Sequence, residues 1–239
     1  MKKQNQTTMG EQSTRQAQTE NQITTEYEQR INNIRLSLEN EIKKVEFKNR
    51  KIIKIDKVNF ANLIKLTGKL ALKKAGDNND FIILEHLKHL IREFYSYTIG
   101  EKYDINSAFA ITGNAGAGKT VAITAFLELL NRIGAIGGYR RISARTFHQE
   151  EDVTKYEKGV LHIEEFGKNP TVVKKYGTEE YPIVNLLMKR YESREITFVD
   201  ANLNRKNLED IYSTLLADRF NQMFNFIEVT SEASLRRKK

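Results

Sequence analysis

The sequence of 239 residues contains no cysteine, no tryptophan and only two prolines. Without cysteine the chain can form no disulfide, no cysteine-ligated zinc site and no thiol nucleophile. No run of apolar residues approaches the roughly 18 that a membrane-spanning helix needs. The amino-terminal residues also lack the apolar segment of a secretory signal. These absences predict a soluble, cytoplasmic protein with no membrane partner.

Charge is unevenly balanced between the two signs. Lysine and arginine together number 39 and aspartate and glutamate 31, which gives a formal net charge of +8. The excess is concentrated in residues 43–57, which contain seven basic and two acidic residues. Such a stretch is typical either of a solvated surface or of an electrostatic contact with DNA phosphates. Both interpretations are open at this point.

The first 104 residues divide into two regions by composition. Residues 1–22 contain almost no apolar side chains, so we expect a disordered polar leader. Residues 23–104 are predicted to form a helical, partner-binding region. Its first helix carries apolar residues spaced by three or four positions, namely Tyr27, Ile31, Ile34, Leu38, Ile42 and Val45. This stripe either packs on the rest of the chain or docks a partner helix.

Two further amphipathic helices are expected before residue 104. The first spans residues 60–74, with Asn59 as a candidate amino-terminal cap and Gly76 just past its end. The second spans residues 80–97 and ends near Gly100.

Residues 105–239 alternate between predicted strands and helices. The candidate strands are residues 107–112, 139–144, 160–163, 195–199 and 226–229. This alternation predicts an α/β domain in which a parallel sheet is flanked by helices and joined by right-handed crossovers. The ten residues after Val229 are too few for a sizeable carboxyl-terminal lid domain.

A glycine-rich segment between a predicted strand and a predicted helix matches the pattern G-x-x-x-x-G-K-T. Its residues are Gly113, Asn114, Ala115, Gly116, Ala117, Gly118, Lys119 and Thr120, and the helix continues with Val121. Glycines let the backbone turn its N–H groups towards phosphate oxygens, and the helix amino terminus adds positive partial charge. We expect Lys119 to reach the β- and γ-phosphates of ATP and the Thr120 hydroxyl to ligate Mg2+.

Two adjacent glutamates follow the predicted strand at residues 160–163. In a P-loop enzyme the carboxylate at the end of a neighbouring strand faces Mg2+, and the next acidic residue polarises the attacking water. We therefore assign Glu164 to the metal and Glu165 to water activation. Glu164 is one methylene longer than the usual aspartate, so the metal geometry or the turnover can differ. His162, inside the strand, is expected to be a core residue.

A third strand, expected at residues 195–199, is also followed by polar residues. In a sheet of this kind a polar side chain at that point lies beside the γ-phosphate. We assign Asn202 to orienting the attacking water. Asp200 is either a rival for that role or a turn residue.

Together these motifs resemble the DnaC-type helicase-loader branch of the AAA+ P-loop ATPases, a group that also includes the IstB-type transposition helpers. The resemblance begins near Ser107 and is carried by residues 113–120, 161–167, 176–178, 186–191, 201–203, 216–220 and 223–225. It implies a homo-oligomeric ATPase that assembles around DNA and holds a client through its amino-terminal region. The client is a replicative helicase for a loader and a transposase for a transposition helper.

The resemblance also assigns roles to arginines. Arg219 matches the position of an arginine finger that reaches ATP on a neighbouring subunit, although a salt bridge to Asp218 or Glu209 is the alternative. Arg236 or Arg237 falls near a second, nucleotide-sensing arginine, and this basic tail could equally contact DNA or be solvated. Because no lid domain is expected, a neighbouring subunit would cover the nucleotide.

The sequence departs from the family pattern at three places. Glu164 replaces the family aspartate, residues 199–202 replace a more threonine-rich sensor, and residues 144–159 leave little room for a DNA-contacting helical insertion. We favour an ATP-dependent replicative-helicase loader that acts on DNA. The alternatives are an IstB-like transposition helper and a nucleotide-gated binding module that does not hydrolyse ATP.

Overall fold

The computed structural model describes residues 25–26, 28–41, 50–104, 106–168, 173–175 and 178–231. The chain separates into two compact units, Met1–Lys48 and Asn49–Lys239, and each is considered by itself. The predicted leader over residues 1–22 lies outside the described residues. Within the described residues, no helix is both long and apolar enough to cross a membrane.

In the amino-terminal unit, the described residues 28–41 are helical. Its apolar residues are exposed, with Ile31 55%, Ile34 53% and Leu38 53% accessible. Apolar residues spaced by three or four positions predicted a helix here, and residues 28–41 are helical. Tyr27, Ile42 and Val45, the other members of the predicted stripe, lie outside the described residues.

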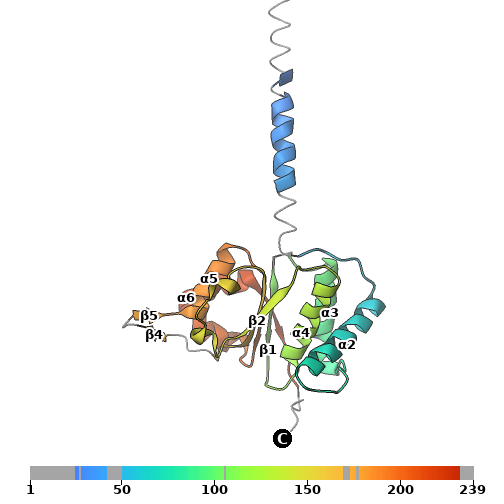
Figure 1. Cartoon of the computed structure of the whole chain (residues 1–239), viewed down its shortest axis with the longest axis vertical. Helices are drawn as coiled ribbons and strands as arrows, with labels where there is room; N and C mark the ends of the chain where they lie inside the picture. The colour runs from blue at the N-terminus through green and yellow to red at the C-terminus, as the bar shows by residue number, and fades with distance from the viewer. Residues whose placement is uncertain are drawn as a thin grey trace, which may run out of the picture. The chain divides into compact units, whose positions relative to one another are not determined.

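The larger unit is built on a five-stranded sheet (Figure 1). Its strands are β1 (Ala108–Thr112), β2 (Tyr139–Ser143), β3 (Val160–Phe166), β6 (Thr197–Ala201) and β7 (Phe224–Glu228). They lie in the order β2-β3-β6-β1-β7, and every neighbouring pair is parallel. All five predicted strands are present, and the predicted parallel α/β fold is confirmed.

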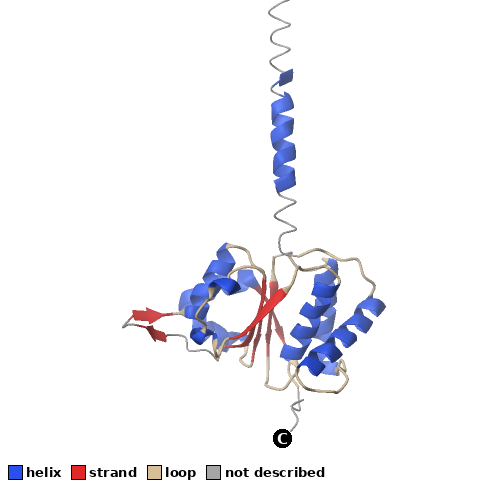
Figure 2. Cartoon of the chain, in the orientation of Figure 1, coloured by secondary structure: helices blue, strands red, loops and turns tan. Residues whose placement is uncertain are grey.

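Helices cover both faces of this sheet (Figure 2). One face carries α2 (Lys57–Lys74), α3 (Glu85–Ile99) and α4 (Lys119–Arg132), and the other carries α5 (Pro182–Glu192) and α6 (Arg205–Met223). Two 3-10 turns, Phe147–Gln149 and Thr154–Tyr156, precede β3, and a small hairpin of β4 (Val173–Lys175) and β5 (Thr178–Glu180) precedes α5. The sheet is therefore the middle of three layers, as expected for a parallel sheet.

The helix boundaries follow from local chemistry. Helix α2 begins at Lys57, earlier than predicted, because the Asp56 carboxylate caps it by accepting the backbone N–H groups of Val58 and Asn59. Helix α3 begins only at Glu85, because the preceding Phe81 packs against Gly68 of α2. A Cβ atom at Gly68 would lie 2.2 Å from the Phe81 ring. The glycine at position 100 ends α3 in the left-handed conformation, as predicted.

Helices α2 and α3 belong to the same core as the phosphate-loop strand and helix. Phe94 of α3 stacks on Phe126 of α4 with ring centroids 4.0 Å apart, and it also contacts Phe109 of β1. Arg50 is buried and its guanidinium lies over the Tyr97 ring, 3.7 Å from the centroid. The structure thus divides the chain near residue 48, with α2 and α3 in the same unit as the sheet.

This packing also divides the basic stretch at residues 43–57. Arg50 is 1% exposed and bonds to the carbonyl oxygens of Tyr97 and Asp104, so it is a core residue. Lys51, Lys54 and Lys57 are exposed, and residues 42–49 lie outside the described part of the chain.

Candidate functional site

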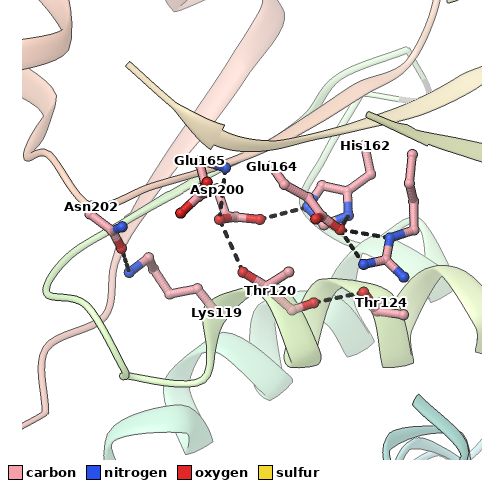
Figure 3. A network of polar contacts seen from close by, with 9 residues as sticks. Lys119, Thr120, Thr124, His162, Glu164, Glu165, Asp200 and Asn202 are labelled. Atoms are coloured by element: carbon pink, nitrogen blue, oxygen red, sulfur yellow. Dashed lines mark hydrogen bonds and ion pairs between the residues drawn. The ribbon is translucent and has the colours of Figure 1, made fainter. Parts of the chain in front are cut away.

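Polar side chains meet where β1, β3 and β6 end (Figure 3). The three strands are parallel, and β6 lies between β3 and β1, so their carboxyl ends share one edge of the sheet. Lys119 and Thr120 follow β1, while Asp200 and Asn202 come from the end of β6. Open parallel sheets bind their ligands at this edge.

The backbone of the glycine-rich segment adopts the conformation that its sequence predicted. Gly113, Gly116 and Gly118 have φ angles of 131°, 83° and 82°, in the region that favours glycine. A Cβ atom at Gly113 would lie 1.8 Å from the carbonyl oxygen of Val229, so no larger residue fits there. Gly118 is also the amino-terminal cap of α4 and offers no side chain to the first N–H groups of that helix. The loop and the helix start together form a set of donors suited to an anion.

The remaining loop residues differ in exposure. Asn114 and Ala115 are exposed, Ala117 is buried in the core, and Val121 in the first turn of α4 is half-buried. The loop tip is thus accessible to a ligand while its base is fixed by packing.

The Lys119 ammonium joins the loop to the end of β6. It donates to the carbonyl oxygens of Gly113 and Asn114 at 3.0 and 2.8 Å and to Oδ1 of Asn202 at 3.0 Å. The residue is only 4% exposed. This arrangement places Asn202 next to the lysine that the sequence assigned to phosphate binding.

Thr120 contacts the carboxylate of Asp200. Its Oγ1 donates to Oδ1 of Asp200 at 3.1 Å, and the backbone N–H of Glu165 points at the same oxygen from 3.4 Å. Oδ2 of Asp200 lies 2.8 Å from Nε2 of the fully buried His162. Burial alone would raise the pKa of Asp200, but the contacts with His162, Glu165 and Thr120 hold that pKa below its ordinary value.

The two glutamates after the apolar part of β3 point to different partners. Glu164 accepts from Nε of Arg141 at 2.7 Å, on the neighbouring strand β2, and also from Nη2 of that arginine. Glu165 has a φ angle of 53° and pairs with Lys168 at 3.2 Å. The pairing of β3 with β6 shifts register between Ile163 and Phe166. A bulge of this kind redirects the side chains around it.

Other predicted site residues lie elsewhere or outside the described part. Arg219 is on α6, and its guanidinium lies over the Tyr191 ring at 5.8 Å from the centroid. The side chain of Asp218, and all of Arg236 and Arg237, are outside what the structure describes. The end of the described chain reaches the loop, because Asn114 exchanges two hydrogen bonds with the backbone of Ser231, at 2.5 and 2.9 Å.

The sequence interpretation gave no functional role to His162 and left that of Asp200 open. A signal was present in the alternation of side chains along a strand. His162 and Glu164 are two residues apart on β3, so their side chains lie on one face of the sheet, and His162 contacts Asp200 on β6. The contact between the two strands is what the sequence did not specify.

The fold is a five-stranded parallel sheet flanked by helices, and a glycine-rich loop joins β1 to α4. No protein-family model and no curated protein sequence matches the chain. Among solved structures, the chain is similar to DnaI, with 16% identity, a TM-score of 0.49, and coverage of 81% of this chain and 100% of that one.

Two other structures show similar values. The DnaC helicase loader has 16% identity and a TM-score of 0.46, with 61% of this chain and 91% of that chain covered. The AMPPCP-bound DnaA from Aquifex aeolicus has 15% identity and a TM-score of 0.47, with 65% of this chain covered. The chain spans 50% of the length of that DnaA structure. These values describe a likeness of fold.

Proposed function

We propose that the chain is a Mg2+-dependent ATPase that hydrolyses ATP to ADP and phosphate and acts as a loader of a replicative helicase on DNA. One observation carries the ATPase part. Two polar pairs, Lys119 with Asn202 and Thr120 with Asp200, lie beside a loop that has three left-handed glycines. Triphosphate binding needs this combination of backbone donors, a lysine, a hydroxyl and a carboxylate.

The donor set also fits Mg2+. Among the described residues there is no group of three or more His, Asp or Glu side chains that could hold a metal ion. Magnesium at nucleotide sites needs no such group, because it binds one or two protein ligands and takes the rest from phosphates and water. When bound, it would neutralise the charge that develops on the phosphates. The Thr120 hydroxyl and a neighbouring carboxylate are sufficient protein ligands.

The surroundings of two side chains support a role in hydrolysis. The backbone N–H of Glu165 lies 3.4 Å from Oδ1 of Asp200, and the Glu165 side chain is 30% exposed. Its carboxylate can therefore accept a proton from a water at the loop. Asn202 contacts the Lys119 ammonium directly and would therefore lie beside the phosphate that Lys119 binds. We propose Glu165 as the general base and Asn202 as the residue that orients the water.

We further propose that the active form is a homo-oligomer in which Arg219 acts on the ATP of a neighbouring subunit. In its own subunit the Arg219 guanidinium lies over the ring of Tyr191, on α5. A guanidinium supplied by another molecule can stabilise the charge on the transferred phosphoryl group. Arg236 remains a proposed nucleotide contact on the sequence resemblance alone.

The client is proposed from the sequence resemblance and from the amino-terminal helix. All described residues of that helix are exposed, including Ile31, Ile34 and Leu38, which lie on one stripe. An amphipathic helix with such a stripe is suited to docking in a groove of a partner. The exposed lysines at positions 51, 54 and 57 support a contact with DNA phosphates.

The helix also provides its own control for a binding test. Leu36 is 57% exposed, as accessible as Leu38, but it lies on another face of the same helix. We expect Leu38→Asp in the full-length protein to weaken binding to the cognate replicative helicase by about 10-fold or more, the value of one buried leucine. Leu36→Asp should bind like wild type.

The measurement is a titration of labelled helicase with each variant. Equal affinities for the two variants would contradict docking by this stripe. No affinity of the wild-type protein for the helicase, together with binding to a transposase encoded beside it, would favour the transposition-helper alternative.

A further inference from the structure

The carboxylate that contacts the Thr120 hydroxyl comes from β6 and not from β3. Asp200 is paired in register with Ile111 of β1, the strand that leads into the phosphate loop. Its Oδ1 lies 3.1 Å from Oγ1 of Thr120, and the residue is 3% exposed. In P-loop enzymes the metal ion lies between this hydroxyl and an acidic side chain. Asp200 is therefore in the position that a metal-facing carboxylate must occupy.

Glu164 is engaged elsewhere. Its Oε1 accepts from two nitrogens of Arg141, on the neighbouring strand β2. The register shift after Ile163 and the left-handed backbone of Glu165 accompany this orientation. To face Thr120, Glu164 would have to leave a charged pair with an arginine, which holds a carboxylate well.

His162 holds Asp200 from the other side. Its ring is fully buried, and Nε2 lies 2.8 Å from Oδ2 of Asp200. With Asp200 ionised, Nε2 carries the proton and donates. The second ring nitrogen, Nδ1, is buried with no hydrogen-bond partner among the described residues and lies 3.9 Å from Oε1 of Glu164. A buried ring nitrogen without a hydrogen-bond partner destabilises the fold. This cost favours a functional role for the contact of His162 with Asp200.

We propose that Asp200, positioned by His162, is the carboxylate that faces the Mg2+ of bound ATP, and that Glu164 is held away from the metal by Arg141. The inference rests on the proposed nucleotide binding. It explains how the chain keeps a metal-facing carboxylate although β3 carries Glu164 where the family has an aspartate. Asp200 supplies the ligand, and His162 is a positioning residue.

The test is the gain in ATP affinity that Mg2+ produces, measured on the full-length protein with a fluorescent ATP analogue, in Mg2+ and in EDTA. We expect Asp200→Asn to lose most of that gain, by about 10-fold or more, since a neutral amide replaces the charged ligand. Its affinity in EDTA should stay within about threefold of wild type. Glu164→Gln is the matched control and should keep the full gain.

Two variants of His162 test the positioning role. His162→Gln keeps an N–H donor and should retain most of the Mg2+ gain, whereas His162→Leu removes it and should lower the gain. Binding of Mn2+ in the presence of ATP, followed by electron paramagnetic resonance, gives a direct metal readout for the same set. Equal gains in the glutamine and leucine variants would contradict the role of His162.

The outcomes separate the two proposals. A wild-type protein that binds no ATP in either condition would refute nucleotide binding itself. ATP binding with a Mg2+ gain that disappears in Glu164→Gln would overturn the Asp200 assignment alone. This last comparison decides the matter even where Asp200→Asn does not fold.

Discussion

A single buried guanidinium ties together the backbone at the end of the sheet opposite the site. Arg190, at the end of α5, is fully buried and donates to the carbonyl oxygens of Tyr156, Gly159 and Ile196 at 2.5, 2.7 and 2.7 Å. Its Nε donates to Oγ1 of Thr197 at 2.8 Å. Burial lowers the pKa of Arg190 to about 10, so it remains charged at neutral pH. These bonds fix the starts of β3 and β6, whose other ends carry the candidate site.

We predict that Arg190→Lys destabilises the protein by about 2–4 kcal/mol. The single ammonium of lysine cannot donate to all four buried oxygens that the guanidinium reaches. Urea unfolding at neutral pH measures the change. Arg92→Lys, on an exposed position of α3, is the control and should cost less than about 0.5 kcal/mol. Equal stability of the two variants would contradict the role given to Arg190.

At the scale of residues, the loop follows from a local pattern, whereas the contacts of the carboxylates around it depend on tertiary structure. The glycines at 113, 116 and 118 are specified by local backbone geometry, so a local pattern is sufficient to find them. The partner of Glu164 depends on a bulge and on an arginine 23 residues away. Neither is visible in the alternation of apolar and polar residues.

Among the elements, α2 and α4 are joined by a charged cluster at their surface. Glu128 of α4 accepts from Nζ of Lys74 at 3.3 Å and from Nε of Arg132 at 2.7 Å, and its side chain is 11% exposed. Burial alone would raise the pKa of Glu128, but these two contacts hold it below the ordinary 4.5. A lowered pKa means that the cluster stabilises the fold above pH 4.5 and that this contribution is lost as the pH falls through the folded-state value.

Glu128→Gln is therefore expected to lower stability by about 0.5–1.5 kcal/mol at pH 7, discounted because both cationic partners are largely exposed. The difference from wild type should shrink as the pH is lowered below 4.5. Unfolding free energies measured by denaturant from pH 7 to pH 3.5 test both statements. Glu209→Gln, which alters an exposed pair within α6, should show a smaller loss at pH 7. A difference that is constant with pH would contradict the account.

The elements themselves were largely readable from the sequence. Short apolar runs predict strands, and the five strands of the parallel sheet were predicted with boundaries within about three residues. The start of α3 was placed too early because residues 80–84 continue the apolar pattern without helical backbone. Their conformation is set by the contact of Phe81 with Gly68, which is tertiary.

At the scale of the whole molecule, α2 and α3 belong to the same unit as the sheet. Both lie in the helical region predicted over residues 23–104, and they contribute Phe60, Leu90 and Phe94 to the core of the sheet. Amphipathic helices look alike whether they cover their own sheet or a partner. Among the helices that the structure describes, the one that includes residues 28–41 belongs to the other unit.

In the proposed assembly, hydrolysis needs residues from two neighbouring subunits. Arg219→Ala should bind ATP normally but hydrolyse it about 100-fold more slowly or worse, since an arginine finger acts on the transition state. Lys119→Ala should fail to bind ATP while still presenting Arg219 to a neighbour.

Mixing the two inactive variants should then restore part of the activity, which a phosphate-release assay can follow against protein concentration. Arg205→Ala, on an exposed position of the same helix, serves as the control and should stay active alone. A mixture that remains inactive would argue for a role of Arg219 within its own subunit, such as packing on Tyr191.

The central claim is that the loop from Gly113 to Thr120 binds a nucleoside triphosphate, and a calorimetric titration with ATP at millimolar Mg2+ tests it most directly. We predict saturable binding by the wild-type protein and an affinity about 30-fold or more weaker in Lys119→Ala, from loss of a charge-assisted contact. Lys88→Ala, on the surface of α3, should bind like wild type. Absence of ATP binding by the wild-type protein, or equal affinity in Lys119→Ala, would contradict the account.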